Sequence, residues 1–96
     1  MMKMDETTWH IMDAMAEDWE SVAQIEPHVR KFCGAVPRSQ INKTLVSLHK
    51  AGLVQAMDGD GNGISELPRA VTGTWFRMTS AGRTAWDTEG RKYRDK

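Results

Sequence analysis

One segment of the 96-residue chain has the composition of a cation-binding loop, MDGDGNGISELP, residues 57–68. A helix–loop–helix calcium loop takes oxygen ligands at positions 1, 3 and 5, a glycine at position 6 and a bidentate glutamate at position 12. The twelfth position here is Arg69, a cation, and Pro68 blocks the second helix. We therefore expect a polar turn without bound calcium. The residues that do fit the loop are Asp58, Asp60, Asn62 and Gly63.

The remaining metal-binding and nucleophilic side chains form no catalytic pattern. The separations of the three histidines from one another and from the single cysteine match no ligand spacing, so we expect no metal site. No nucleophile stands in a motif, and no glycine-rich stretch has the pattern of a phosphate loop. We expect no enzyme and no cofactor, with Cys33 a buried small hydrophobe and His49 a surface residue. The four residues are His10, His28, Cys33 and His49.

Length and composition predict one small domain. The hydrophobic share is 40%, which is ordinary for a globular chain and permits a modest core. The first six residues contain no apolar run, so we expect no signal peptide, and no stretch approaches membrane-spanning length. A single cysteine suits a reducing compartment, and we expect the cytoplasm.

The formal net charge is zero, but the charges are unevenly distributed. Residues 1–26 carry seven acids and one lysine, whereas residues 27–57 carry five basic side chains and no acid. Long-range steering toward a polyanion should therefore be weak, while one face can still be locally positive.

The first elements that would support such a face are two helices. Residues 5–17 are predicted to form a helix whose apolar stripe is Trp9, Met12, Ala16 and Trp19. A proline inside a helix costs about 3 kcal/mol, so we expect residues 21–24 to form a strand and Pro27 to open a second helix, 26–33. Gly34 can end that helix in the left-handed conformation. Its apolar face would be Val29, Phe32 and Cys33.

A third helix is predicted from Arg38 to Ala51, and Gly52 ends it. Ile41, Leu45 and Leu48 recur at helical spacing and would face the core. The outward positions carry no acid, although a helix that needs only solubility usually mixes its signs. These outward residues are Arg38, Ser39, Gln40, Asn42, Lys43 and Ser47.

Two strands, residues 53–57 and 73–79, should form a hairpin around the glycine loop, with residues 58–63 at its tip. A short fourth helix is expected over residues 81–88. The domain would span residues 1–89, and the charged residues 90–96 would be a mobile tail.

Two stretches resemble bacterial winged helix-turn-helix regulators of the MarR-like and PadR-like kind. VPRSQINKTLVSLHKAGLV, residues 36–54, is similar to the family's third helix and its exit into the wing. FRMTSAGRTAW, residues 76–86, is similar to the second wing strand and the "LT-x-x-G-R" segment after it. The resemblance covers roughly residues 9–87 and implies an α+β winged-helix fold. The second stretch carries its match on Met78, Thr79, Gly82 and Arg83.

The resemblance implies double-stranded DNA as the partner, with the third helix in the major groove. It assigns base readout to Arg38, Ser39, Gln40, Asn42 and Lys43. Arginine can read guanine, and glutamine or asparagine can read adenine. Phosphate contacts are expected from Arg30, Lys31, Ser47, Lys50, Arg69 and Arg77.

Two functions therefore remain open. The chain is either a small DNA-binding protein, such as a bacterial transcription regulator or a phage or mobile-element accessory factor, or a winged helix used for protein–protein contact. The neutral net charge and acidic wing favour the second function, and the acid-free third helix favours the first. A homodimer, if formed, is expected to use the first and fourth helices with the tail, because these carry additional tryptophan and methionine residues.

Overall fold

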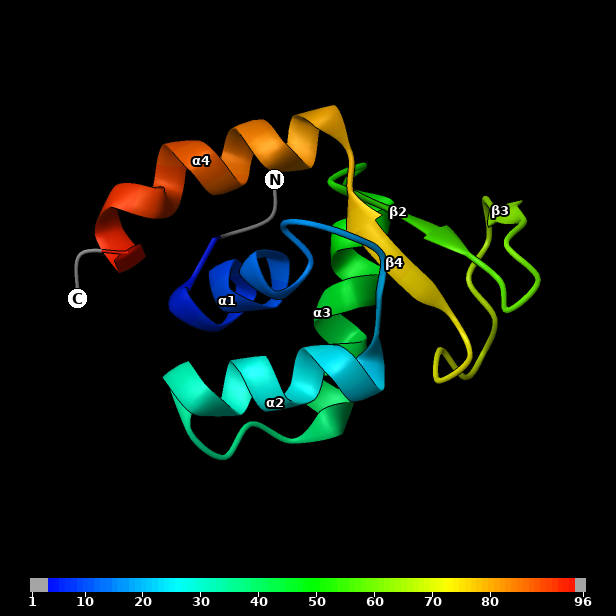
Figure 1. Ribbon diagram of the computed structural model, residues 1–96, viewed down its shortest axis with the longest axis horizontal. Coiled ribbons are helices and arrows are strands. Elements are labelled where there is room, and N and C mark those ends of the chain that lie inside the picture. The colour runs from blue at the N-terminus through cyan, green and yellow to red at the C-terminus, as the bar shows by residue number, and fades with distance from the viewer. Residues whose placement is uncertain (1–3, 95–96) are drawn as a thin grey trace.

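Three helices surround one hydrophobic core: α1 (Glu6–Ala14), α2 (Val22–Cys33) and α3 (Arg38–Lys50). A fourth helix, α4 (Ser80–Arg94), packs on α1, so that α1 lies between α4 and α2 (Figure 1). This is a computed structural model that describes residues 4–94. In this range no helix has the length and apolar character needed to cross a membrane.

The four strands found among the described residues form one antiparallel sheet in the order β1-β4-β2-β3. They are β1 (Glu20–Ser21), β2 (Val54–Met57), β3 (Gly63–Ile64) and β4 (Trp75–Met78). Ala56 of β2 is opposite Phe76 on one side and Ile64 on the other. The β2–β3 hairpin projects away from the helices (Figure 1).

The helices and the inner face of the sheet share one core, which confirms the expected α+β class. Ile41, Leu45 and Leu48 of α3 are fully buried, as their spacing predicts. Phe76 of β4 is also fully buried, whereas Arg77 beside it is exposed, as strand alternation requires. The other fully buried core side chains are Ile11, Met12, Val22, Ile25 and Val29.

The predicted strand over residues 21–24 is found only at Ser21, the last residue of β1, because α2 begins at Val22 and contains Pro27 in its interior. The Gln24 side chain accepts a hydrogen bond from the Ser21 N–H at 2.9 Å, which fixes the start of the helix. Val22 and Ile25 then lie on the same buried face as Val29. Burying such a side chain stabilises by about 1.5–3 kcal/mol, so two further buried residues offset the cost of the proline.

The apolar faces of the first two helices also differ from expectation. Helix α1 ends at Ala14, so Ala16 and Trp19 are not part of it. Trp19 instead lies under the Arg77 guanidinium, 5.1 Å from the ring centre. On α2, Phe32 is 50% exposed rather than part of the core. The expected cap of α1 is confirmed, since the Asp5 carboxylate accepts from the Thr8 N–H at 2.7 Å.

The glycine loop turns the chain between β2 and β3, not between β2 and β4 as expected. The Asp58 carboxylate accepts from the backbone N–H groups of Asp60 and Asn62, at 2.9 and 3.0 Å. Gly61 has a φ of 86°, which favours glycine. A second loop, residues 65–74, then leads to β4 on the other side of β2.

Helix α4 is almost twice as long as the eight residues expected, because it continues to Arg94. Residues 90–94 of the predicted mobile tail are therefore helical, and residues 95–96 lie outside the described part of the chain. The Thr79 hydroxyl accepts from the Gly82 N–H at 3.1 Å and donates to the Gly52 carbonyl at 2.7 Å. These bonds attach the first turn of α4 to the end of α3.

Aromatic side chains join α1 to α4. The Trp9 indole donates to the Trp86 carbonyl at 2.8 Å, and the two rings stack with centroids 6.1 Å apart. Trp9 is 2% exposed, so it contributes to the core of one chain rather than to its surface. The predicted homodimer through these helices stays a prediction, in which Trp9 cannot be a contact residue.

Candidate nucleic-acid interface

The exposed face of α3 carries most of the residues that the sequence assigned to base readout. Helix α3 starts directly after Pro37, which offers no side-chain cap, and the Gln40 N–H instead bonds the Pro37 carbonyl at 3.0 Å. The side chains of the first turn, residues 38–40, lie on the surface. The exposed polar residues of α3 are Arg38, Ser39, Gln40, Lys43, Ser47 and Lys50.

Arg38 is exposed but already paired. Its guanidinium donates two hydrogen bonds to the carboxylate of Glu26 on α2, at 3.0 and 3.1 Å. The guanidinium holds the pKa of the Glu26 carboxyl below its ordinary value, mainly through this hydrogen bond and with a further contribution from Arg30. Glu26 therefore stays negative at neutral pH, and it partly neutralises the positive charge at the start of α3.

Four of the predicted DNA contacts meet around one hollow beside α3. Lys43 and Ser47 extend along it from the helix, and Arg69 reaches it from the loop between β3 and β4. Sequence reasoning placed Arg69 near phosphate without showing where it lies; the fold brings it to α3. The α3 hollow is lined by Asn42, Lys43, Val46, Ser47, Arg69 and Val71.

Asn42 is half-buried at this hollow, so its prediction as a fully outward residue is wrong. Its side-chain oxygen is buried and has no hydrogen-bond partner among the described residues. Val71, which lines the same hollow, is 4% exposed and packs into the core. Asn42 therefore lines the same hollow as the loop after β3, which helical periodicity alone does not indicate.

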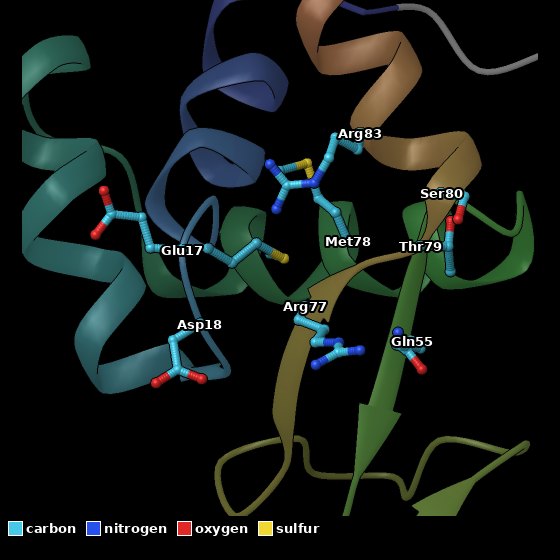
Figure 2. A pocket seen from close by; sticks show the side chains of 9 residues that line it. Glu17, Asp18, Gln55, Arg77, Met78, Thr79, Ser80 and Arg83 are labelled. Atoms are coloured by element: carbon cyan, nitrogen blue, oxygen red, sulfur yellow. The ribbon is translucent and has the colours of Figure 1, made fainter.

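The other predicted phosphate contacts are scattered. Arg30 lies 3.8 Å from Glu26, and Lys31 faces the other side of α2, beside Glu6 and Phe32. Arg77 projects with Gln55 from the sheet face turned away from α3 (Figure 2).

Arg77 belongs to a separate cavity with mixed charges. Figure 2 shows Arg77 and Arg83 around the same space as Glu17 and Asp18. The Arg83 guanidinium donates to the Ala16 carbonyl at 2.5 Å, which fixes the chain after α1. Two cations and two anions leave the cavity without net charge, so it does not extend the basic surface of α3.

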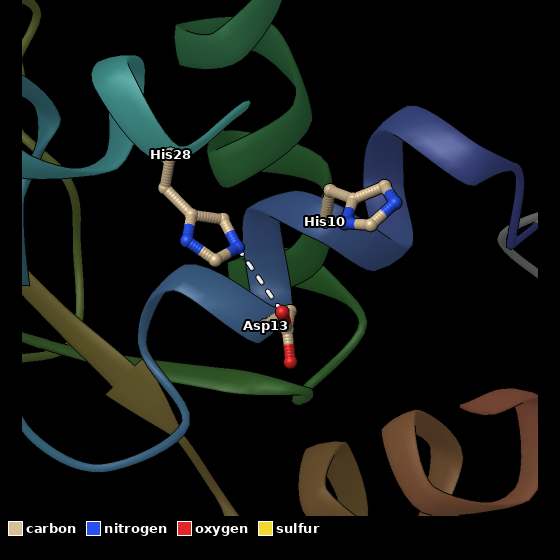
Figure 3. Close-up of side chains that lie close together, drawn as sticks. All are labelled: His10, Asp13 and His28. Carbon is tan, nitrogen blue, oxygen red and sulfur yellow. Dashed lines mark hydrogen bonds and ion pairs between the residues drawn. The ribbon is translucent and has the colours of Figure 1, made fainter. Parts of the chain in front are cut away.

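A cluster of possible metal ligands was missed by the sequence argument. His10 and Asp13 of α1 lie beside His28 of α2, with one ligand atom from each within 4.8 Å of the others (Figure 3). The signal in the sequence was the three-residue spacing of His10 and Asp13, which places both on one face of a helix. His28 could not be added, because its contact with α1 depends on how the helices pack.

Cys33 is less buried, and His49 less exposed, than the sequence predicts. Cys33 is half-buried rather than buried, although it packs against the core. Burial raises the pKa of its thiol, a hydrogen bond with Thr7 opposes this, and Glu6 and Asp5 add to the rise. His49 is half-buried on α3.

Comparison with known proteins adds no identification to this geometry. The chain matches no protein-family model, no curated protein and no solved structure.

Proposed function

We propose that the chain binds double-stranded DNA and that α3 enters the major groove. The observation that carries this proposal is the exposed face of α3, which has no acidic residue and is extended by Arg69 across the α3 hollow. Such a surface offers both polar side chains for base edges and cations for phosphates.

The arrangement of the elements supports a winged helix-turn-helix. Three helices with one short strand after the first are followed by β2, a projecting hairpin turn and β4, and β1 pairs with β4. In this reading α2 and α3 form the helix-turn-helix and the β2–β3 hairpin forms part of the wing. The turn carries Asp58 and Asp60, which would repel phosphate, so we place α3 rather than the hairpin tip against the duplex.

The neighbours of each candidate DNA-contact residue indicate which part of the duplex it would contact. Gln40 and Lys43 are exposed near the start of α3 and pair with no acidic side chain within residues 4–94, so they are the strongest candidates for contacts with bases. Lys50 and Arg69 are suited to phosphates. The Nε and Nη2 groups of Arg38 that bond Glu26 would reach DNA only if they exchanged the carboxylate for a base edge or phosphate. The biological role would be that of a transcription regulator or an accessory factor of a phage or mobile element.

Protein–protein contact is the second candidate. Val46, 38% exposed, lies on α3 in the centre of the proposed DNA surface, where an apolar side chain suits a protein partner better than a phosphate. The pairing of Arg38 with Glu26 also lowers the positive charge there.

The experiment compares DNA binding by the parent and by Gln40→Ala with Lys43→Ala, using fluorescence anisotropy at low salt. Both side chains are exposed, so the double variant should fold, and its free energy of unfolding should stay within about 0.5 kcal/mol for each substitution. We expect its DNA affinity to fall by at least about tenfold, since one base contact is worth about 1–3 kcal/mol.

The control is Arg91→Ala, which removes one positive charge from an exposed position on α4, as Lys43→Ala does on α3. It should bind DNA as the parent does. If a folded double variant also binds as the parent does, α3 is not a recognition helix, and the protein-contact function takes its place. An unbiased DNA selection on the parent would then define the sequence read, and a palindromic motif would indicate a dimer.

A further inference from the structure

We propose that His10, Asp13 and His28 form a binding site for one divalent transition-metal ion of the zinc class. The site is separate from the α3 surface and does not depend on the proposed DNA binding. It lies where α1 crosses α2, and it would join the two helices through a shared ion (Figure 3).

The donor set selects the class of ion. Two imidazole nitrogens and one carboxylate oxygen suit zinc, cobalt and nickel, whereas calcium and magnesium prefer oxygen ligands throughout. Three protein ligands leave a fourth position of a tetrahedral ion for water.

The distances are close to those that an ion needs. The His28 Nε2 atom already lies 3.0 Å from Asp13 Oδ2, a separation that two ligands of one zinc ion can have. The three ligand atoms lie within 4.8 Å of one another, whereas ligands about 2.1 Å from a shared ion can be at most about 4.2 Å apart. A small side-chain rotation would therefore close the site. The side chain of His28 is 30% exposed and has room for this movement.

Neighbouring groups hold two of the ligands in orientation. The second oxygen of Asp13, Oδ1, accepts a hydrogen bond from the Trp86 indole at 3.1 Å, which leaves Oδ2 turned toward His28. The His10 ring stacks on Phe32, with centroids 4.7 Å apart and planes 2° from parallel. Trp9 packs edge-on against the same ring. Such outer contacts fix the orientation of metal ligands and raise metal affinity.

The site is accessible and its surroundings attract cations. Asp13 lines two surface cavities, one shared with His10 and the other with His28, so an ion can approach from either side of the carboxylate. The first cavity also contains Glu6 and Lys31, and the second contains Glu17, Glu20 and Arg83. With Asp13, the two cavities hold four acids against two cations, and this excess of negative charge favours a divalent ion.

The test uses the full chain without a histidine tag, stripped with a chelator and then titrated with zinc ions by calorimetry. We expect one zinc ion per chain and a higher melting temperature with zinc. His28→Gln should weaken zinc binding by about tenfold or more and remove the rise in melting temperature. His49→Gln is the matched control, because His49 is also half-buried but lies on α3, and it should bind zinc as the parent does.

Two further measurements keep the test decisive. Cobalt absorption of the parent should show bound metal without the intense thiolate band, and Cys33→Ser should leave both zinc affinity and the spectrum unchanged. Should His28→Gln fail to fold, Asp13→Asn is measured in its place. Absence of stoichiometric zinc binding to the parent would overturn the proposal. A thiolate band, or a His28→Gln variant with the affinity of His49→Gln, would also overturn it.

Discussion

Gly82 of α4 lies so close to Leu53 that a Cβ atom on residue 82 would be 1.8 Å from the Leu53 carbonyl oxygen. The same carbonyl accepts a hydrogen bond from the Thr79 N–H at 3.1 Å. The first turn of α4 is therefore in direct backbone contact with the start of β2, and only glycine allows this approach.

We predict that Gly82→Ala destabilises the fold by about 1–3 kcal/mol, the range seen when atoms are forced into a packed site. This is opposite to the usual effect of alanine, which stabilises a helix by about 1 kcal/mol relative to glycine. Urea unfolding followed by circular dichroism measures the change. Gly59→Ala is the control, because a Cβ there meets no atom within 4 Å and should alter stability little. Equal stability of Gly82→Ala and the parent would contradict the close contact.

The role of Asp58 is predicted to be local and independent of calcium. Asp58→Ala removes two hydrogen bonds to the backbone of the β2–β3 turn, so we expect a loss of about 1 kcal/mol. Asp60→Ala has the same change in charge, but the Asp60 carboxylate accepts no hydrogen bond from the described part of the chain, so this substitution should cost less. Melting temperatures of all three proteins should be unaffected by calcium, because Arg69 stands where the bidentate carboxylate of a calcium loop would be. Calcium stabilisation that Asp58→Ala abolishes would overturn this prediction.

The thiol of Cys33 should react slowly near neutral pH. Burial raises the pKa of this thiol, and a raised pKa lowers the fraction of reactive thiolate at any pH below it. Alkylation in the folded chain should therefore be slower than in the urea-unfolded chain, and the difference should narrow as the pH rises through the raised pKa. The rate is measured with a small maleimide reagent, and a folded chain that reacts as fast as the unfolded one would exclude the effect.

Sequence reasoning predicted best where one local signal dominates. Helix α3 was predicted to within one residue, because three apolar residues at helical spacing and a following glycine agree. Helix α2 was predicted wrongly because the local cost of Pro27 was weighed without the burial of Val22 and Ile25, which depends on the tertiary fold. The length of α4 was missed for a related reason, since Tyr93 near its end reaches the Met4 carbonyl of a distant segment.

In the candidate sites too, features set by local periodicity were predictable, whereas contacts between distant elements were not. The acid-free face of α3 was readable from periodicity, and most of its residues are exposed as expected. The pairing of Arg38 with Glu26 and the position of Arg69 join different elements, so no spacing along the chain could indicate them. His28 joins His10 and Asp13 in the same way.

The final prediction concerns the effect of Glu26 on DNA binding. Glu26→Gln should strengthen DNA binding several-fold at low salt, because it removes a negative charge beside α3 and releases the Arg38 guanidinium for phosphate. One additional phosphate contact would steepen the dependence of log affinity on log salt by about 0.9. Anisotropy titrations at several salt concentrations measure both quantities.

A control variant and two alternative outcomes distinguish an effect of Arg38 from an effect of net charge. Glu89→Gln removes the same charge from α4, where Glu89 pairs with Lys92 at 3.0 Å, and it should change DNA affinity much less. Equal gains in both variants would show that only net charge matters, and that Arg38 makes no contact of its own. Weaker binding by Glu26→Gln alone would show instead that the Glu26 carboxylate holds Arg38 in position to contact a base edge. A specific base contact requires a side chain that is fixed in this way. The ion pair between α2 and α3 would then be part of the recognition surface rather than a restraint on it.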